Sequence, residues 1–221
     1  MAPVIVYADI SAFQAGIDVG VLPGPVLVAR VASYVSARIT AGTFLDLEWP
    51  RHRDEARRVG KAPVAYHYIG QTVSPEWQVE QTLRWIGAPP GEIPIMVDWE
   101  EGSGDGSWLH AVTDEFIRRG ARVPMGYVPR WYWTGHGQPD LRRFPIVVNS
   151  DYRTHSPDNP AGWAPLGPAA VGALQYTDRA AHGGHNIDMN AFRGDAEQLS
   201  ALLGAGTVGS SRRRKILLLN D

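Results

Sequence analysis

The sequence predicts an α/β fold, a single irregular β/α (TIM-like) barrel with about eight strands. Apolar, β-branched runs of strand length alternate with amphipathic helical segments, which is typical of a parallel sheet. About eight such runs occur, the number that closes a β/α barrel, and 221 residues is at the short end for that fold. The last runs follow one another closely, so we expect reduced helices near the C-terminus.

The expected strands are apolar runs bounded by Gly, Pro or polar residues. They comprise residues 3–10, 25–31, 62–69, 93–100, 123–128, 144–150, 170–177 and 186–192. A polar segment between the second and third runs, residues 51–61, is expected to be helical.

Two further segments, 74–87 and 107–120, carry the signals of complete amphipathic helices. Each has apolar residues at helical spacing, which predicts one buried face. Ser74 fits an N-cap, and Gly87 and Gly120 fit the positions where helices end.

Composition narrows the classes of function. Lys plus Arg total 21 and Asp plus Glu total 23, so the near-neutral charge predicts no nucleic-acid partner. The chain has no cysteine, which excludes disulfides, thiolate zinc sites and a cysteine nucleophile. No apolar run approaches the length of a membrane helix, and no signal peptide is visible, so we expect no stable membrane insertion. We expect one catalytic domain over residues 1–204, followed by a linker or flexible tail over 205–221.

Four carboxylates fall at the same predicted edge of the barrel. The run "IPIMVDWEEG" ends in Asp98 and Glu100, which point to the same side because side chains alternate along a strand. Asp9 closes the first strand and Asp188 lies in the last. Catalytic residues of such barrels lie at the C-terminal ends of the strands, so we expect the four to converge. Their mutual repulsion and burial should raise the pKa of at least one of them.

The spacing of Asp98 and Glu100 fits glycoside hydrolysis, which needs one protonated and one ionised carboxyl group. Glu100 is the expected acid because it reaches further, and because Asp98 beside it disfavours ionisation. Asp98 is expected to act as nucleophile, base or electrostatic partner, or to orient an N-acetyl group that attacks the sugar. The spacing leaves inverting, retaining and substrate-assisted courses open. Asp9 and Asp188 have a structural alternative, since Asp also caps loops.

The histidines have structural interpretations as well. His182 and His185 flank a Gly pair, and we expect a solvent-exposed loop there rather than a metal site. His67 lies in the third strand, where a hydrogen-bonded core or groove histidine is expected.

Several stretches resemble the glycoside hydrolase family 25 lysozymes in order and spacing. The resemblance runs from about Tyr7 to Phe192, and its most specific parts are an opening Asp-Ile-Ser-x-x-Gln, an Asp-x-Glu at a strand end, and a closing Ile-Asp-Met-Asn. The stretches are "YADISAFQAGID", "APVAYHYIG", "IPIMVDWE", "VPMGYVPRWYW", "ALQYTD" and "NIDMNAF".

The resemblance implies an N-acetylmuramidase that cleaves the β-1,4 bond between N-acetylmuramic acid and N-acetylglucosamine in bacterial peptidoglycan. By position, Glu100 would be the acid/base and Asp98 its partner, with Asp9 and Asp188 completing the acidic cluster. The residues that match the sugar groove are Tyr66, Tyr127, Gln175 and Tyr176. The family needs no cofactor or metal, and we expect a monomer. A phage endolysin, made in the host cytoplasm and acting on the cell wall, is expected by analogy.

Two departures from the family pattern concern substrate subsites. The family's Lys-Ala-Thr-Glu-Gly-like segment reads "ARVASYVSARITAG" here, and a strand that usually carries Trp reads "PIVVNSDY". Trp131 and Trp133 are candidates to supply the missing stacking surface. The alternatives are a chitinase-like hydrolase and a catalytically inactive barrel that binds cell-wall glycan.

Overall fold

The computed structural model describes residues 4–34 and 44–204. The predicted tail over 205–221 and most of the departing segment after the second strand lie outside these residues. The strands are β1 (Val4–Ile10), β2 (Val26–Ser33), β3 (Phe44–Leu45), β4 (Ala62–Tyr68), β5 (Ile95–Asp98), β6 (Met125–Tyr127), β7 (Ile146–Ser150), β8 (Val171–His182) and β9 (His185–Arg193).

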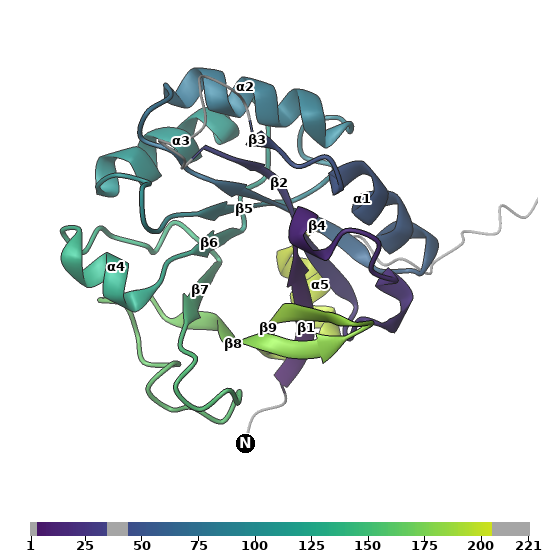
Figure 1. Ribbon diagram of the computed structural model, residues 1–221. Coiled ribbons are helices and arrows are strands. Elements are labelled where there is room, and N and C mark those ends of the chain that lie inside the picture. The colour runs from purple at the N-terminus through teal and green to yellow at the C-terminus, as the bar shows by residue number, and fades with distance from the viewer. Residues whose placement is uncertain (1–3, 35–43, 205–221) are drawn as a thin grey trace, which may run out of the picture.

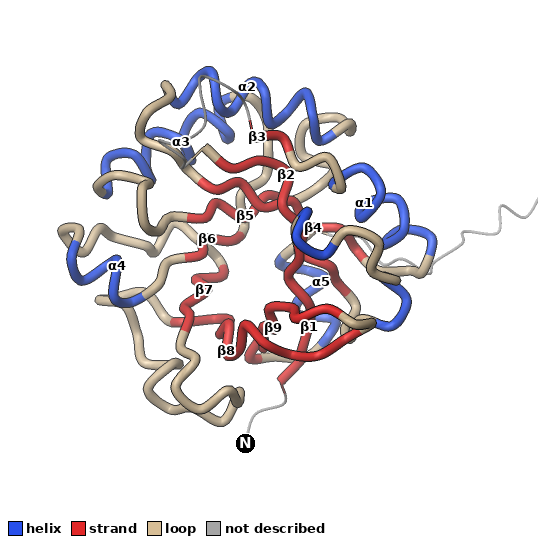
Figure 2. Tube along the Cα trace, viewed as in Figure 1, coloured by secondary structure: helices blue, strands red, loops and turns tan. Residues whose placement is uncertain are grey.

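Eight of these strands close into a barrel, which Figures 1 and 2 show along its axis. The order around the barrel is β1-β9-β8-β7-β6-β5-β4-β2, and pairing of β1 with β2 completes the ring. All eight strands match runs expected from the sequence, so the predicted irregular barrel is confirmed. The two-residue strand β3 pairs with the end of β2 and was not predicted.

The prediction of an all-parallel sheet is wrong for one strand. β9 runs antiparallel to both of its neighbours, β8 and β1. It does so because β8 and β9 are joined by Gly183 and Gly184 alone, with φ values of 56° and 82°. A two-residue turn with positive φ at both positions joins antiparallel strands of a hairpin. The exposed loop expected around His182 and His185 is therefore a hairpin, in which these two residues pair.

The helices are α1 (Trp49–Arg58), α2 (Pro75–Ile86), α3 (Gly106–Arg118), α4 (Arg130–Gly135) and α5 (Ala196–Leu202), with two short 3₁₀ turns, η1 (Ala12–Gln14) and η2 (Val19–Val21). The helical signals are confirmed: the Ser74 side chain accepts a bond from the N–H of Trp77, and Gly87 ends α2 with φ 67°. Figure 1 shows α1, α2 and α3 beside the half of the barrel that contains β2, β4 and β5. The half containing β7 and β8 is covered mainly by loops, as expected from the short segments between the last predicted strands. Within residues 4–34 and 44–204, no helix is long and apolar enough to cross a membrane.

The inside of the barrel changes from apolar to polar along the strands. At the end where the parallel strands begin, the barrel is filled by a buried apolar cluster. Its members include Val26, Val64 and Ile146, which lie near the starts of their strands. Leu199 and Leu203, from α5 and its end, pack into the same cluster. The apolar core and α5 thus close one end of the barrel, which leaves the other end for polar side chains.

His67 belongs to the outer core, between β4 and the helices. Its Nδ1 lies 2.9 Å from Thr82 Oγ1, and its Nε2 lies 3.0 Å from Gln78 Oε1. Burial lowers the pKa of His67 to about 4. The expected hydrogen-bonded core histidine is confirmed, and this histidine is neutral at physiological pH.

Candidate active site

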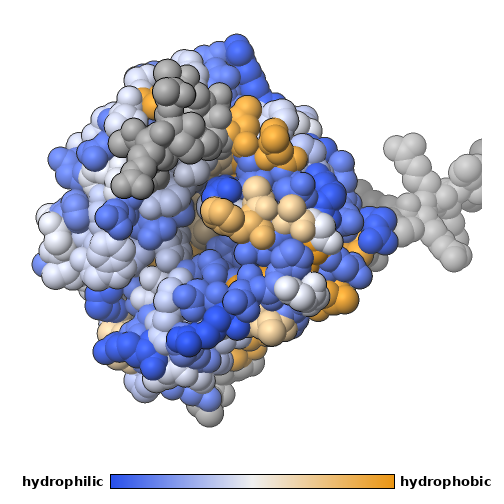
Figure 3. Space-filling model, viewed as in Figure 1, coloured by the Kyte–Doolittle hydropathy of each residue, from blue (hydrophilic) through white to orange (hydrophobic). Residues whose placement is uncertain are grey.

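A cavity of about 300 Å³ opens at the polar end of the barrel. Figure 3 shows the surface hollowed near the centre of this end, with hydrophobic side chains along part of the rim. All four predicted carboxylates line the cavity, as do three of the four residues matched to the sugar groove: Asp9, Asp98, Glu100, Asp188, Tyr66, Tyr127 and Gln175.

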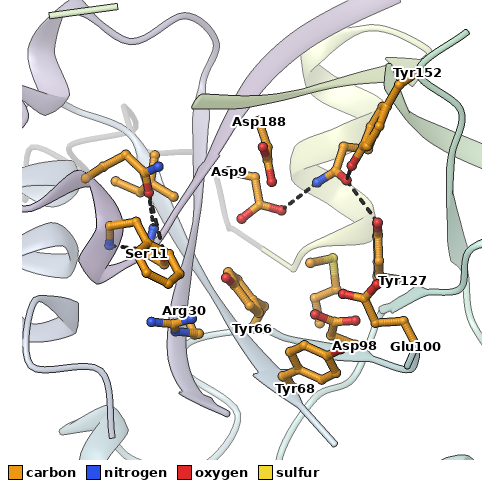
Figure 4. A pocket seen from close by; sticks show the side chains of 15 residues that line it. Asp9, Ser11, Arg30, Tyr66, Tyr68, Asp98, Glu100, Tyr127, Tyr152 and Asp188 are labelled. Carbon is orange, nitrogen blue, oxygen red and sulfur yellow. Dashed lines mark hydrogen bonds between the residues drawn. The ribbon is translucent and has the colours of Figure 1, made fainter. Parts of the chain in front are cut away.

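Strand register brings the acids into two pairs, which face each other across the cavity in Figure 4. Asp9 of β1 lies directly opposite Asp188 of the antiparallel β9. Asp98 ends β5, and Glu100 follows two residues later. Asp98 is in register with Tyr68 of β4 and with Tyr127 of β6, so aromatic side chains flank this pair on both sides.

The turn after β5 fixes Glu100. Its backbone N–H donates to Ser103 Oγ at 3.1 Å. Trp99 is fully buried on the outer side of the strand end, where its indole N–H donates to the carbonyl of Gly104 at 3.1 Å. With Trp99 held outside, Asp98 and Glu100 both face the cavity, as the alternation predicts.

Gln175 connects the two sides of the cavity. Its Nε2 donates to Asp9 Oδ2 at 3.3 Å, and its Oε1 accepts bonds from the hydroxyls of Tyr127, at 3.0 Å, and Tyr152. These are the dashed lines at the right of Figure 4. Because the amide is held at both ends, it fixes the orientation of the Asp9 carboxylate and of both tyrosines.

Burial raises the pKa of every acid in the cluster, and repulsion from nearby carboxylates raises it further. The pKa values of Asp9 and Asp98 lie well above the usual value, first because of burial and then because of the neighbouring carboxylates. Burial and then the charges of Asp188 and Glu101, rather than that of Asp98 as expected, raise the pKa of Glu100 to about 7, and burial raises that of Asp188 to about 6. Asp98 Oδ1 is buried and has no hydrogen-bond partner among the described residues. The cluster therefore binds protons at neutral pH and shares them between its members.

Arg30 is a cationic member of the site that was not predicted. It lies in β2 in register with Tyr66, lines the cavity, and donates from Nε to Asp46 Oδ2 at 2.9 Å. Its positive charge lowers the pKa of Asp9 and of Asp98, partly offsetting their burial, and is not a cause of the shift at Glu100. Arg30 therefore makes ionised aspartates less unfavourable in this buried site without acting on Glu100, although the pKa values of both aspartates stay well above the usual value.

Tyr68 and Tyr152 also line the cavity without having been predicted, whereas Tyr176 does not line it. Tyr176 follows Gln175 in β8, and consecutive side chains of a strand point to opposite faces. Since Gln175 faces the cavity, Tyr176 packs against the outer hydrophobic core. Of the two candidate stacking residues, Trp133 is buried and Trp131 is 57% exposed.

The part of the chain that the structure describes holds no group of three or more His, Asp or Glu side chains arranged to bind a metal ion. His182 and His185 face each other at the end of the β8–β9 hairpin.

Comparisons with known proteins agree with this architecture. The chain is similar in structure to a muramidase from Trichobolus zukalii (TM-score 0.72, 18% identity, covering 91% of this chain and 100% of that one). It is equally similar to a family GH25 lysozyme from Aspergillus fumigatus (0.72, 19%, 91% and 99%). A bacterial lysozyme from Streptomyces coelicolor also matches (0.67, 16%, 92% and 98%). At these identities the likeness establishes the fold.

Sequence comparison identifies the family. A comparison with curated proteins gave no match. The model of the glycosyl hydrolases family 25 matches residues 8–185, which contain three of the four acids and all of the barrel strands from β2 to β8. The chain therefore belongs to the glycosyl hydrolases family 25 and is a glycoside hydrolase.

Proposed function

We propose that this chain is a peptidoglycan N-acetylmuramidase that cleaves the β-1,4 bond between N-acetylmuramic acid and N-acetylglucosamine, with Glu100 as general acid and Asp98 as its partner. The observation that carries the proposal is the pairing of Glu100, whose pKa is about 7, with Asp98 at the end of β5 in one cavity. Family membership and the fold shared with muramidases support the same activity.

In the proposed reaction, protonated Glu100 donates its proton to the glycosidic oxygen as the bond from that oxygen to the anomeric carbon breaks. Positive charge develops on the sugar ring, and the Asp98 carboxylate stabilises it. A water molecule then adds its oxygen to the anomeric carbon, and its proton passes to the carboxylate cluster, which restores the acid. Arg30 assists because its positive charge partly offsets the burial that raises the pKa of Asp98 and has no such effect at Glu100, so it favours the working form in which Glu100 carries the proton. An acid with a pKa near the working pH is both protonated and able to give up its proton.

Asp9, Asp188 and the groove residues are proposed to hold the sugar. The Asp9–Gln175–Tyr127 hydrogen bonds present oriented carboxylate, amide and hydroxyl groups to the hydroxyls and acetamido groups of a glycan. A barrel that only binds cell-wall glycan is less favoured. Buried carboxylates cost folding free energy, and a purely binding role would not require four of them.

The direct test is incubation of the protein with purified peptidoglycan and, separately, with chitin oligomers, followed by assay of new reducing ends. The proposal predicts release from peptidoglycan and much slower release from chitin. Faster cleavage of chitin would favour the chitinase-like alternative. Binding to peptidoglycan without release from either polymer would favour the inactive barrel.

The raised pKa of Glu100 predicts that activity falls in alkaline solution. Glu100 works in its protonated form, so kcat/KM on a soluble glycan should fall about tenfold per pH unit above pH 7. The measurement is a pH–rate profile from pH 5 to 9, with circular dichroism to show that the protein stays folded. A profile that stays flat to pH 9 would exclude a titrating acid with this pKa.

Replacing Arg30 with Met should move the acidic limb of the same profile to higher pH. Without the guanidinium, the pKa values of Asp98 and Asp9 rise, so the aspartates take up protons that Glu100 should carry. Arg30→Lys keeps the positive charge and should leave the limb near its wild-type position. The Tm of each variant shows whether losing the Arg30–Asp46 ion pair destabilises the fold, which distinguishes a loss of stability from the shift in the pH profile. Equal profiles for the two variants would show that Arg30 has only a structural role.

An endolysin role is part of the proposal by analogy with the family, with residues 1–204 as the catalytic domain. An endolysin reaches the wall through a membrane opened by a separate protein. Cytoplasmic expression in a bacterium should therefore cause lysis only when a membrane-permeabilising protein is produced as well. Lysis by the enzyme alone would contradict this route.

A further inference from the structure

A second recess adjoins the catalytic cavity on the same face of the barrel. It has a volume of about 580 Å³, and its lining includes Gln71, Glu101, Trp131, Tyr132 and His136. These residues follow the ends of β4, β5 and β6, which places the recess at the C-terminal edge where the acids lie.

The recess and the cavity share a wall. Glu101, which lines the recess, directly follows Glu100, which lines the cavity. Tyr68 lines the cavity and donates its hydroxyl to the carbonyl oxygen of Glu101 at 2.8 Å. The recess is therefore within reach of a glycan strand that extends from the cavity past Glu100.

The recess is built from fixed groups. The hydroxyl of Tyr132 donates to the carbonyl of Gly104 at 2.7 Å, and the ring of Tyr132 stacks on His136 at 3.7 Å. Gly104 has φ +79°, and a Cβ there would lie 2.6 Å from Trp108. Only glycine fits this position without strain, so the turn that forms the wall of the recess is set by the sequence.

Trp131 presents a flat apolar surface at this recess. Its side chain is 57% exposed, and it meets Tyr132 edge-on, with ring centroids 5.4 Å apart and an interplanar angle of 79°. Tyr132 thus supports the indole at one side and leaves much of it open to solvent. The side chains of Gln71 and Glu101 line the same recess and can form hydrogen bonds. An exposed aromatic face beside amide and carboxylate groups suits a ring that is apolar on its faces and polar at its edge.

We propose that the recess is a subsite for a further N-acetylhexosamine unit of the glycan strand, which stacks on Trp131 beyond the sugars held in the cavity. The inference rests on the proposed function for the identity of the polymer. It adds a residue that determines how strongly longer strands bind. The occupant is the substrate itself, because the recess lies beside the cavity at the same edge of the barrel, separated from it only by the turn that carries Glu100 and Glu101.

The test measures affinity in the absence of cleavage. Glu100→Gln protein, with and without Trp131→Ala, is titrated by calorimetry with peptidoglycan glycan oligomers of increasing length. Loss of the stacking surface should raise Kd for the longest oligomer roughly tenfold, and much less for the shortest oligomer that fills the cavity. Trp131→Phe should recover most of the affinity. Ile117→Ala, which removes an exposed apolar side chain near the C-terminal end of α3, should leave every Kd unchanged.

Two results would overturn the subsite. One is an unchanged Kd for all lengths with Trp131→Ala, and the other is an equal loss for all lengths, which would show a general structural effect. A different result would refute the proposed function: the wild-type protein would release no reducing ends from the same oligomers. Because binding is measured on its own, length-dependent loss with Trp131→Ala still supports the subsite in that case.

Discussion

Replacing Glu100 with Gln is expected to lower kcat on peptidoglycan by at least about 100-fold. A glutamine amide has the size of the carboxyl group but no acidic proton to donate to the leaving oxygen. The substitution leaves the cavity's shape intact, so the affinity for glycan should change little. The measurement is the rate of appearance of reducing ends, with Kd determined in parallel by calorimetry.

Glu197→Gln is the matched control, because Glu197 is an exposed carboxylate on α5, which packs against the closed end of the barrel. It should retain wild-type activity. If Glu100→Gln kept more than a tenth of the wild-type rate, the general acid would have to be another residue of the cluster.

Replacing Asp98 with Asn is expected to lower activity by about 100-fold or more while making the protein more stable at pH 8. Activity falls because the neutral amide no longer stabilises positive charge on the sugar. Stability rises because Asp98 is buried with an unpartnered Oδ1, and its pKa in the folded state is well above the usual value. The folded protein therefore binds this proton more tightly than the unfolded chain. Its stability falls as pH rises above the unfolded pKa.

The measurement is Tm of the wild type and of Asp98→Asn at pH 4 and at pH 8. At pH 4 the carboxyl group is largely protonated in the folded state, so the two proteins should differ little. At pH 8 the variant should have the higher Tm, and Glu197→Gln should show no such pH-dependent gain. A lower Tm for Asp98→Asn at both pH values would show that the carboxylate stabilises the fold and would refute the raised pKa.

Much of the fold could be predicted because its signals are local. The barrel strands are largely apolar runs bounded by turn signals, and all eight were located from such runs. The strand β3 has two residues and depends on pairing with β2, so no local signal marks it. The β8–β9 hairpin and α5 did have local signals that were not used. Gly183-Gly184 is a hairpin turn, and Asp195 with Gln198 forms a capping box.

The candidate site could be predicted to a similar degree. Asp9, Asp98 and Glu100 lie where strand ends predict them, at the C-terminal edge. Asp188 reaches that edge for a different reason from the one expected: β9 is antiparallel, and Asp188 lies near its beginning.

The alternation of side chains along a strand explains the remaining differences between the predicted and observed cavity lining. Applied to β8, it places Gln175 in the cavity and Tyr176 on the opposite face. Applied to "YHY" in β4, it places Tyr68 in the cavity together with Tyr66. Arg30 was detectable as a lone charge within an apolar strand. Which of Trp131 and Trp133 is exposed depends on how α4 packs, and that is set by tertiary contacts.

The most direct test of the central claim identifies the sugar at each new reducing end. Peptidoglycan digested by the wild-type protein is reduced with borohydride, hydrolysed and analysed for amino-sugar alcohols, with Glu100→Gln digested in parallel. The account predicts muramitol in the wild-type digest and almost none with the variant. Glucosaminitol in place of muramitol, or equal amounts of muramitol from the two proteins, would contradict it.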